Sequence, residues 1–411
     1  MFKKIPLLIQ VLAAVIFGIL LGGHVPVQIV RIFSTFRAIF SEYLDFSIPL
    51  IILGLIISGI SSLGNRSGKI LVLTIILAYG STLFSGFLTW FTCVNIFPSL
   101  LKGISFEAPP AASELLQTPF FILEIPPVMS VMSALVLAFI LGIGIAAIRS
   151  QSLQNIADDF RQIVELVIRK TIIPFLPLFI FCIFLMMTAE GTVWKILHVF
   201  GQVILVVFAL HFFLLALQFI FSGLIAKKNP LKMLWTMFPA YATALGTSSS
   251  AATIPVTLIQ VKKMGVRPQI AEFCVPLCAT IHLSGSTMKI TAFSIAIMIL
   301  LGKTAAISIY APFILLLGVT MVAAPGVPGG AIMAAAALLG SILGFNETAV
   351  GLMIALYLTT DCFGTACNVC GDGAISAIVN RMSSRLIPDL HDGPLEDIQL
   401  TGNSDTIRNK P

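Results

Sequence analysis

Two apolar segments, each long enough to cross a membrane, are interrupted by polar residues and glycine. The first interruption covers residues 280–287, and the second covers residues 361–372, which include Asp361 and Asp372. Lipid cannot hydrogen-bond an interrupted backbone, so such breaks persist only where protein surrounds them or where they line a cavity. Ionisable groups at that depth are costly, and they mark the path of a ligand or an ion. These segments therefore predict a polar site inside a membrane-embedded protein.

The composition is that of a polytopic membrane protein. Of the 411 residues, 58% are hydrophobic and 10% are charged, whereas a soluble domain carries about 25% charged residues. The formal net charge of +6 does not indicate a nucleic-acid partner, because most Lys and Arg residues lie in short loops between apolar runs. The seven cysteines lie almost entirely within apolar runs, which favours buried packing over a disulfide framework or a thiolate metal site. No covalent cofactor is expected.

The chain changes character near its middle, from uniformly apolar to rich in Ser, Thr, Gly and Ala. Membrane-spanning helices are predicted near residues 5–22, 38–63, 69–98, 126–148, 161–188 and 192–225. Four further segments, several with prolines near their centres, follow at residues 230–262, 267–299, 304–342 and 348–381. The polar residues 386–411 are expected to form a cytoplasmic tail without a fold of its own.

The loop charges predict that both termini are cytoplasmic. With the N-terminus inside, the cytoplasmic loops hold Lys3, Lys4, Arg66, Lys69, Arg149, Arg161, Lys227, Lys228, Lys232, Lys262, Lys263, Arg267, Arg381 and Arg385. The opposite side then holds Arg31, Arg37, Lys102, Lys195 and Lys303. This asymmetry follows the positive-inside rule and indicates a multi-pass protein of the cytoplasmic (plasma) membrane.

The same charges predict that residues 230–262 form a re-entrant hairpin. Its two basic ends fall on one side of the membrane, and this length is too short for two spans of ~20 residues plus a turn. Its tip is predicted at residues 248–255, and residues 304–342 repeat the plan from the opposite face with a tip at 323–330. A broken helix follows each hairpin, giving the inverted repeat found around secondary-transporter sites. The predicted fold class is an all-α polytopic membrane protein with eight transmembrane helices, two re-entrant helical hairpins and inverted repeats.

Three motifs then make the chain similar to a known family. They are the serine-rich tip that ends in Ile254-Pro255-Val256, the second tip Gly326-Val327-Pro328-Gly329, and the pattern Asp361…Thr365…Asn368…Gly371-Asp372. With them the chain resembles the dicarboxylate/amino acid:cation symporters, the glutamate-transporter homologues. The resemblance implies a homotrimer in the lipid bilayer and an elevator mechanism. It also implies a mainly scaffold and trimerisation region with parts of the transport domain (1–225), a transport core (226–385) and a tail (386–411).

The resemblance also implies which residues bind an amino acid substrate. They are Ser249, Ser250, Ser286, Val327, Gly329, Asp361, Gly364, Thr365 and Asn368. In the family, the aspartate at the position of Asp361 binds the substrate's amino group. An ammonium group is the expected partner for a buried carboxylate. Simpler roles stay open at this point: Asp361 could lie near the interface, Ser249 could cap the tip, and Thr365 and Asn368 could cap the break.

Two departures from the family pattern bear on the substrate. Acidic amino acid transporters of the family hold the side-chain carboxylate with an arginine, and the two positions that can carry it are Gly364 and Ser248 here. Burying a second carboxylate without a partner costs several kcal/mol. We therefore predict transport of small neutral amino acids such as serine, threonine or alanine. The alternatives are a symporter of small dicarboxylates or other organic solutes and, in another class, an anion-conducting channel on the same scaffold.

The candidate cation sites depart from the family as well. Candidate sodium ligands, some through backbone carbonyls, are Asp372, Asn368, His282, Cys278, Tyr79 and Thr82. The aspartate of a second sodium position is replaced by Ser284, so that position should bind sodium weakly or not at all. His282 could carry a proton instead. Lys289, seven residues further on and so on the same helical face, could act as a tethered cation near the lost site, or its side chain could extend to water. We predict coupling to Na+ with reduced stoichiometry, and the alternatives are partial coupling to H+ or simple exchange.

An enzyme is not expected. The sequence contains no His/Glu metal motif, no Gly-x-Ser-x-Gly elbow and no paired acid/base constellation. The sequence does not determine which neutral amino acid is carried, how many ions are coupled, or whether the protein performs net uptake or exchange.

Overall fold

The computed structural model describes residues 7–64, 69–102, 118–189, 191, 193–324 and 328–386, and in these ranges it contains helices and connecting turns but no strands. The first group of helices comprises α1 (Leu7–Gly22), α2 (Val27–Gly64), α3 (Lys69–Leu100), α5 (Val131–Ile148), α6 (Gln151–Val167), the π-helical turn η2 (Ile168–Ile172), α7 (Ile173–Ala189) and α8 (Val193–Ala226). The second comprises α9 (Pro230–Thr247), α10 (Ser250–Lys263), α11 (Pro268–Ile281), α12 (Ser284–Leu300), α13 (Ile307–Ala323), α14 (Gly330–Ser341), α15 (Glu347–Thr359) and α16 (Asp361–Leu386). The predicted tail beyond residue 386 lies outside the described residues.

The prediction of an all-α polytopic membrane protein is confirmed. Among the described residues, six helical stretches are long and apolar enough to cross a membrane, namely Val27–Ser58, Ile70–Leu100, Gln151–Ala189, Val199–Ala226, Pro268–Leu300 and Asp361–Ser383. Shorter apolar helices accompany them, so the count of eight crossings stays a prediction.

Two predicted spans are shorter than the helices that the structure shows. The second span begins at Val27 rather than near residue 38, and the fifth begins at Gln151 rather than near residue 161. Helix α6 is amphipathic, and polar residues such as Gln154 and Asp158 interrupt its apolar run, which is why hydropathy alone missed it. The Ser150 hydroxyl accepts the Leu153 N–H and caps this helix, which then runs on through η2 into α7.

The C-terminal helices form two hairpins, each followed by a helix that breaks. Helices α9 and α10 meet at Ser248, which has a left-handed backbone, and α13, which ends at Ala323, packs against α14, which begins at Gly330. Helices α10 and α14 contain 14 and 12 residues, about 21 and 18 Å, so neither can cross a ~30 Å hydrocarbon core. These lengths fit re-entrant hairpins. The two breaks lie at residues 282–283, between α11 and α12, and at Thr360, between α15 and α16.

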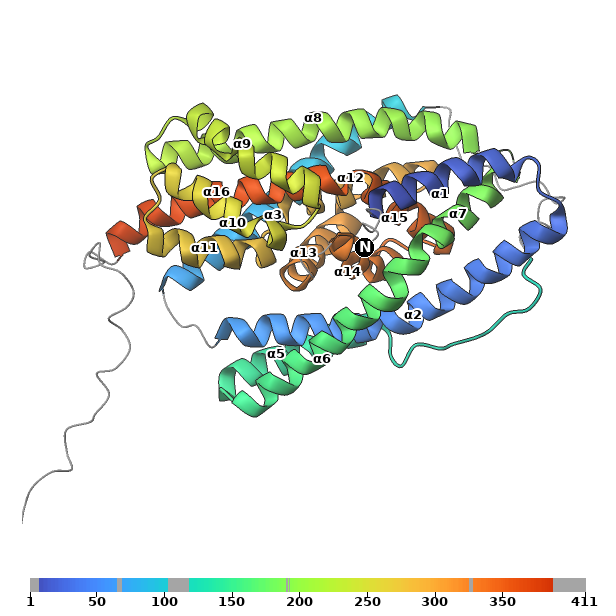
Figure 1. Ribbon diagram of the computed structural model, residues 1–411, viewed down its shortest axis with the longest axis horizontal. Coiled ribbons are helices and arrows are strands. Elements are labelled where there is room, and N and C mark those ends of the chain that lie inside the picture. The colour runs from blue at the N-terminus through green and yellow to red at the C-terminus, as the bar shows by residue number, and fades with distance from the viewer. Residues whose placement is uncertain are drawn as a thin grey trace, which may run out of the picture.

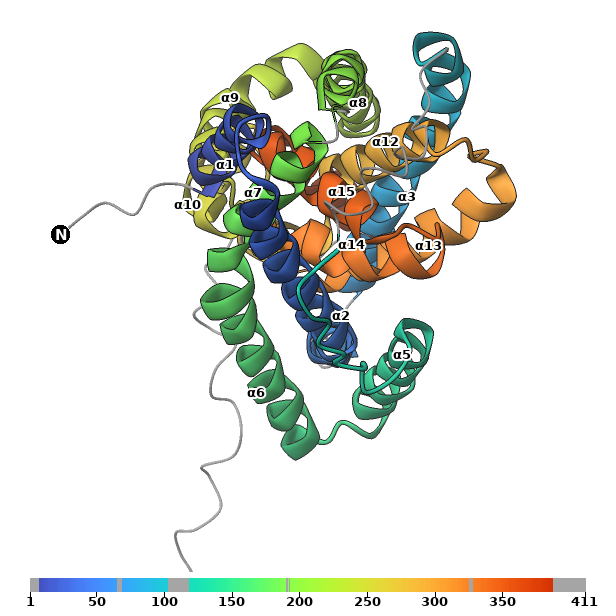
Figure 2. The same ribbon diagram turned by 90° about the vertical axis from the view of Figure 1, so that its right-hand side faces the viewer.

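The broken helices occupy the interior of the protein. In Figure 1, α12, α15 and α16 lie between α8 on one side and α2, α5 and α6 on the other. Figure 2 shows α14 and α15 near the centre of the end view. In the most apolar 18-residue stretches of Pro268–Leu300 and Asp361–Ser383, 94% of the residues are buried, against 33% in the corresponding stretch of Ile70–Leu100. The polar groups at the breaks are therefore surrounded by protein, as the opening sequence argument requires.

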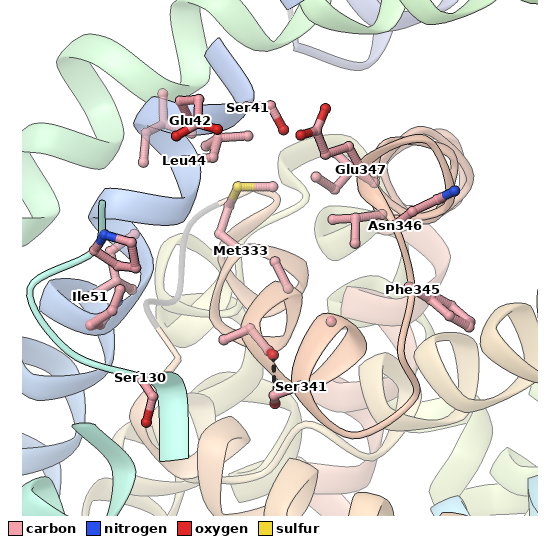
Figure 3. A pocket seen from close by; sticks show the side chains of 18 of the residues that line it. Ser41, Glu42, Leu44, Ile51, Ser130, Met333, Ser341, Phe345, Asn346 and Glu347 are labelled. Carbon is pink, nitrogen blue, oxygen red and sulfur yellow. Dashed lines mark hydrogen bonds between the residues drawn. The ribbon is translucent and has the colours of Figure 1, made fainter. Parts of the chain in front are cut away.

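A cavity of about 720 Å³ separates part of the N-terminal helices from the second hairpin. Figure 3 shows Ser41, Glu42 and Leu44 of α2 facing Met333 of α14 and Glu347 of α15 across this cavity. At the same boundary the Arg37 guanidinium donates to the Thr348 hydroxyl at 3.2 Å. The packing between these two parts of the molecule is therefore incomplete.

Candidate functional site

The first buried charge lies at the break between α15 and α16. Asp361 is the first residue of α16, where the positive end of the helix dipole favours a carboxylate. The side chain is 6% exposed, and its Oδ2 accepts the backbone N–H of Gly329 at 2.8 Å. Gly329 has a left-handed backbone (φ 75°) and caps the N-terminus of α14. The N-terminal end of α14 therefore contacts Asp361 directly.

A buried ammonium group faces this carboxylate. Lys289 of α12 is 1% exposed, so its side chain does not extend to water. Its Nζ lies 3.0 Å from the Thr360 carbonyl oxygen, 3.7 Å from Asp361 Oδ1 and 3.8 Å from the centre of the Tyr357 ring. A Cβ placed on Gly364 would lie 2.3 Å from Lys289 Cε and 2.6 Å from Nζ. The lysine thus occupies the space that the missing side chain at position 364 leaves open.

A hydrogen-bonded network joins α12, α15 and α16 beside this pair. Asn368 Oδ1 accepts the backbone N–H groups of Gly285 at 2.8 Å and Ser286 at 3.4 Å. Its Nδ2 donates to Ser286 Oγ at 3.1 Å, and the Tyr357 hydroxyl donates to the same oxygen at 2.8 Å. The predicted residues Ser286 and Asn368 are therefore brought together, and the network fixes the first turn of α12 against α16.

The second buried charge, Asp372, lies with His282 in a separate polar cluster. His282 Nδ1 lies 2.9 Å from Asp372 Oδ1, and its Nε2 lies 3.0 Å from the hydroxyl oxygen of Ser81 in α3. An ionised carboxylate only accepts, so Nδ1 carries a proton when Asp372 is ionised. The side-chain amide of Gln218 in α8 donates to the Ser284 hydroxyl at 2.9 Å. Four helices and one break therefore contribute to this cluster.

Two oxygen atoms of this cluster lack a hydrogen-bond partner among the described residues. They are Asp372 Oδ2 and Gln218 Oε1, and both are buried. A Cβ on Gly371 would lie 2.4 Å from His282 Cε1 and 3.1 Å from Gln218 Oε1, so the two side chains pack against the backbone beside Asp372. Buried polar atoms are normally paired, and unpaired carboxylate and amide oxygens are ligands that suit Na+. The cluster therefore offers chemistry for one cation, while Ser284 contributes no carboxylate.

The predicted residues of the two hairpin tips lie in different situations. The Ser249 hydroxyl accepts the Ala252 N–H at 3.3 Å and so caps α10, and Ser250 is buried in its first turn. Gly329 contacts Asp361 as described above. Val327 lies outside the described residues.

The remaining candidate ligands make local contacts. Tyr79 donates to the carbonyl of Leu315 in α13 at 3.2 Å, and the Thr82 hydroxyl donates to a carbonyl of its own helix. The Cys278 carbonyl accepts the His282 N–H at 2.8 Å. The Thr365 hydroxyl likewise donates within its own helix, to the Asp361 carbonyl at 3.0 Å. Their predicted binding roles stay predictions.

Sequence reasoning missed three residues of the site, namely Ser81, Gln218 and Tyr357. Gln218 is a strong signal in retrospect, because it is a polar residue inside the long apolar helix α8. Ser81 and Ser85 are four residues apart on α3, and the Ser85 hydroxyl donates to the Ser284 carbonyl at 2.7 Å. Tyr357 carries no such pattern. The spacing argument also associated Lys289 with His282. In the structure Lys289 pairs with Asp361 and His282 pairs with Asp372. These two acids are separated by about 16 Å along α16.

Comparison with known proteins agrees with this architecture. The model of the sodium:dicarboxylate symporter family matches residues 7–382. The serine/threonine transporter SstT of Acinetobacter baumannii (strain AYE) is 25% identical over 398 residues, which cover 93% of this chain and 98% of that protein. The serine/threonine transporter SstT of Acinetobacter baylyi (strain ATCC 33305 / BD413 / ADP1) is 26% identical over 374 residues, or 86% and 92% of the two chains. The predicted resemblance is confirmed, and the chain belongs to the sodium:dicarboxylate symporter family, a family of membrane transporters rather than enzymes.

Proposed function

We propose that this member of the symporter family carries small neutral amino acids of the serine, threonine and alanine type across the plasma membrane. The observation that carries the proposal is the buried Asp361 carboxylate, held at a helix break directly beneath Gly329 of the second hairpin. A buried acid that is reached by opening one hairpin suits a substrate ammonium group. Two relatives named as serine/threonine transporters support the same class of substrate.

Coupling in this proposal uses fewer sodium ions than the full family pattern. The family implies Na+ as the coupling ion. Asp372 and Gln218 provide unpaired oxygen atoms for one cation, whereas the second position has Ser284 in place of a carboxylate. The His282 ring, which contacts Asp372, would take up a proton where no sodium ion binds. One Na+ or one H+ would then accompany each substrate.

The proposal extends to assembly and motion. A homotrimer would hold the scaffold helices fixed while hairpins and broken helices move together as an elevator. The incompletely filled boundary between α2 and α14 is consistent with such sliding, because close packing would have to be broken at every cycle. Both termini would face the cytoplasm, as the loop charges predict.

The decisive experiment is a ligand panel on the purified full-length protein, read as the shift in its melting temperature with and without Na+. The panel contains neutral amino acids, acidic amino acids and dicarboxylates without an amine. We expect stabilisation by serine, threonine or alanine that increases with Na+ or at lower pH. Stabilisation only by dicarboxylates would show that they, and not neutral amino acids, are the substrates. A steep dependence on several sodium ions would contradict the reduced sodium stoichiometry.

One observation favours a second candidate, the symport of small dicarboxylates. The Lys289 ammonium supplies a cation beside Gly364, at the position where sequence reasoning expected none. A carboxylate of such a solute could pair with it. The panel separates the two candidates, because a dicarboxylate without an amine has no group for Asp361.

A further inference from the structure

The buried cation of the site points toward the proposed substrate position rather than toward the ion cluster. The Lys289 ammonium is in contact with the carbonyl of Thr360 at the α15–α16 break, with the carboxylate of Asp361 at the start of α16 and with the ring of Tyr357 near the end of α15. We propose that Lys289 determines substrate specificity by binding the carboxylate of the transported amino acid, while Asp361 binds its ammonium group. This inference rests on the proposed function and names the two charged groups that the substrate must carry.

The geometry leaves the lysine free to exchange partners. Its Nζ and Asp361 Oδ1 are 3.7 Å apart, beyond the 2.7–3.2 Å range of roughly ideal N–H···O bonds. Of its three N–H donors, the described contacts engage one at hydrogen-bonding distance, with the Thr360 carbonyl at 3.0 Å. An aromatic face lies beneath the ammonium and stabilises the charge without using a donor. Donors therefore remain for an incoming carboxylate.

Charge balance selects the class of substrate. The single charges of Lys289 and Asp361 cancel in the empty site, and both side chains are buried. A zwitterionic amino acid brings no net charge, so its carboxylate and ammonium can separate the pair and leave every charge with an opposite neighbour. An acidic amino acid would add one unbalanced negative charge, and an amine without a carboxylate would add one positive charge. Uncompensated buried charge is strongly unfavourable, so the pair favours zwitterions over both.

Gly364 is what admits the lysine. Any side chain at this position would begin 2.3 Å from Lys289 Cε, inside the contact distance of two carbon atoms. The loss of the family's arginine at position 364 and the presence of a lysine at 289 are therefore a matched pair of features. Adding a methyl group at position 364 should displace the ammonium without removing its charge from the protein.

The test compares L-serine with L-serinamide, which keeps the amine and lacks the carboxylate. Binding of each is measured by calorimetry on the purified full-length protein at saturating Na+ and at a pH where both amines are protonated. The unaltered protein should prefer serine by at least roughly tenfold, the ratio expected for one charge-assisted hydrogen bond. In Lys289→Met, which keeps an unbranched chain of similar length, serine affinity should fall about 10- to 100-fold and the preference for the carboxylate should disappear. A Lys289→Met protein that still prefers serine to the same extent overturns the inference.

A second variant protects the test against misfolding. Gly364→Ala should also reduce the preference for serine over serinamide, because its methyl group displaces the lysine. Gly144→Ala in α5 is the matched control, since a Cβ there meets nothing within 4 Å. If Gly364→Ala folds and keeps the full preference, the lysine is not the carboxylate partner. If the unaltered protein binds no amino acid at all, the proposed function fails instead. Equal affinity for L-aspartate and L-serine in the unaltered protein contradicts the charge balance alone.

Discussion

Two buried carboxylates on one helix have different basic partners. Asp361 faces the Lys289 ammonium and the Gly329 N–H, whereas Asp372 contacts the His282 ring. The two acids therefore face basic groups of different chemistry, an ammonium group at Lys289 and an imidazole ring at His282. The two ends of the site can therefore serve different tasks, with the α15–α16 break binding the substrate and the His282 cluster binding the cation.

Asp361→Asn should abolish measurable binding of neutral amino acids. The substitution removes the acid that would pair with the substrate ammonium, and it leaves the Lys289 ammonium without its counter-charge. We expect a loss of at least about 100-fold in serine affinity, the scale of breaking a buried ion pair. Calorimetry or the shift in melting temperature measures this, with size-exclusion behaviour as the control for folding. Unchanged serine affinity would disprove the assignment of Asp361.

Asp372→Asn should act on the cation rather than on the substrate. The amide cannot replace the carboxylate oxygen that lacks a partner, and it weakens the contact with His282. Serine binding should lose its dependence on Na+ and on pH while some cation-independent affinity remains. Titrations of serine at several Na+ concentrations and pH values test this. A variant with the same cation dependence as the unaltered protein would place the coupling site elsewhere.

At the scale of the helices, glycines set how closely two elements approach. Gly18 and Gly22 are four residues apart on α1, a spacing that allows close contact between membrane helices. A Cβ at Gly22 would lie 2.6 Å from the Leu185 carbonyl oxygen and 2.5 Å from Thr188 Cβ of α7. The glycines therefore allow α1 to lie directly on the α7 backbone. Close van der Waals packing of this kind is one of the forces that hold helices together in lipid.

Gly22→Ala should loosen this contact and destabilise the protein. Backbone atoms of α7 block the new methyl group, so the helices must separate, at a cost of about 1–3 kcal/mol. The melting temperature of the purified protein should fall. Gly144→Ala, where a Cβ has open space, should melt like the unaltered protein. Equal melting temperatures for the two variants would show that α1 adapts without cost.

At the scale of the whole molecule, the N-terminal helices and the second hairpin meet across a boundary that is only partly filled. The cavity between α2 and α14–α15 and the Arg37–Thr348 hydrogen bond mark this boundary. In the proposed elevator motion these surfaces slide past each other. A covalent link across these surfaces should therefore stop transport and leave substrate binding intact.

The double variant Arg37→Cys/Thr348→Cys, linked by a short bifunctional maleimide, tests this motion. The seven native cysteines are buried, so the introduced pair should react preferentially. Uptake into reconstituted vesicles should stop on linking, while serine binding in detergent should persist. The two single variants treated with the same reagent are the controls. Full uptake after complete linking would contradict sliding at this boundary.

The sequence alone determined that this is a polytopic helical membrane protein with polar breaks near residues 280–287 and 361–372, because polar backbone in lipid must be surrounded by protein. It also determined the family, through motifs that are local in the chain. Only the tertiary structure decided which charges face each other. Lys289 contacts residues about seventy positions away, and His282 contacts Asp372 ninety positions away. Helical spacing associated these two basic residues, but the helix is interrupted at residues 282–283, so the periodicity of α12 does not extend back to His282. Their partners depend on how α12 and the break before it pack against α16, which no local pattern records.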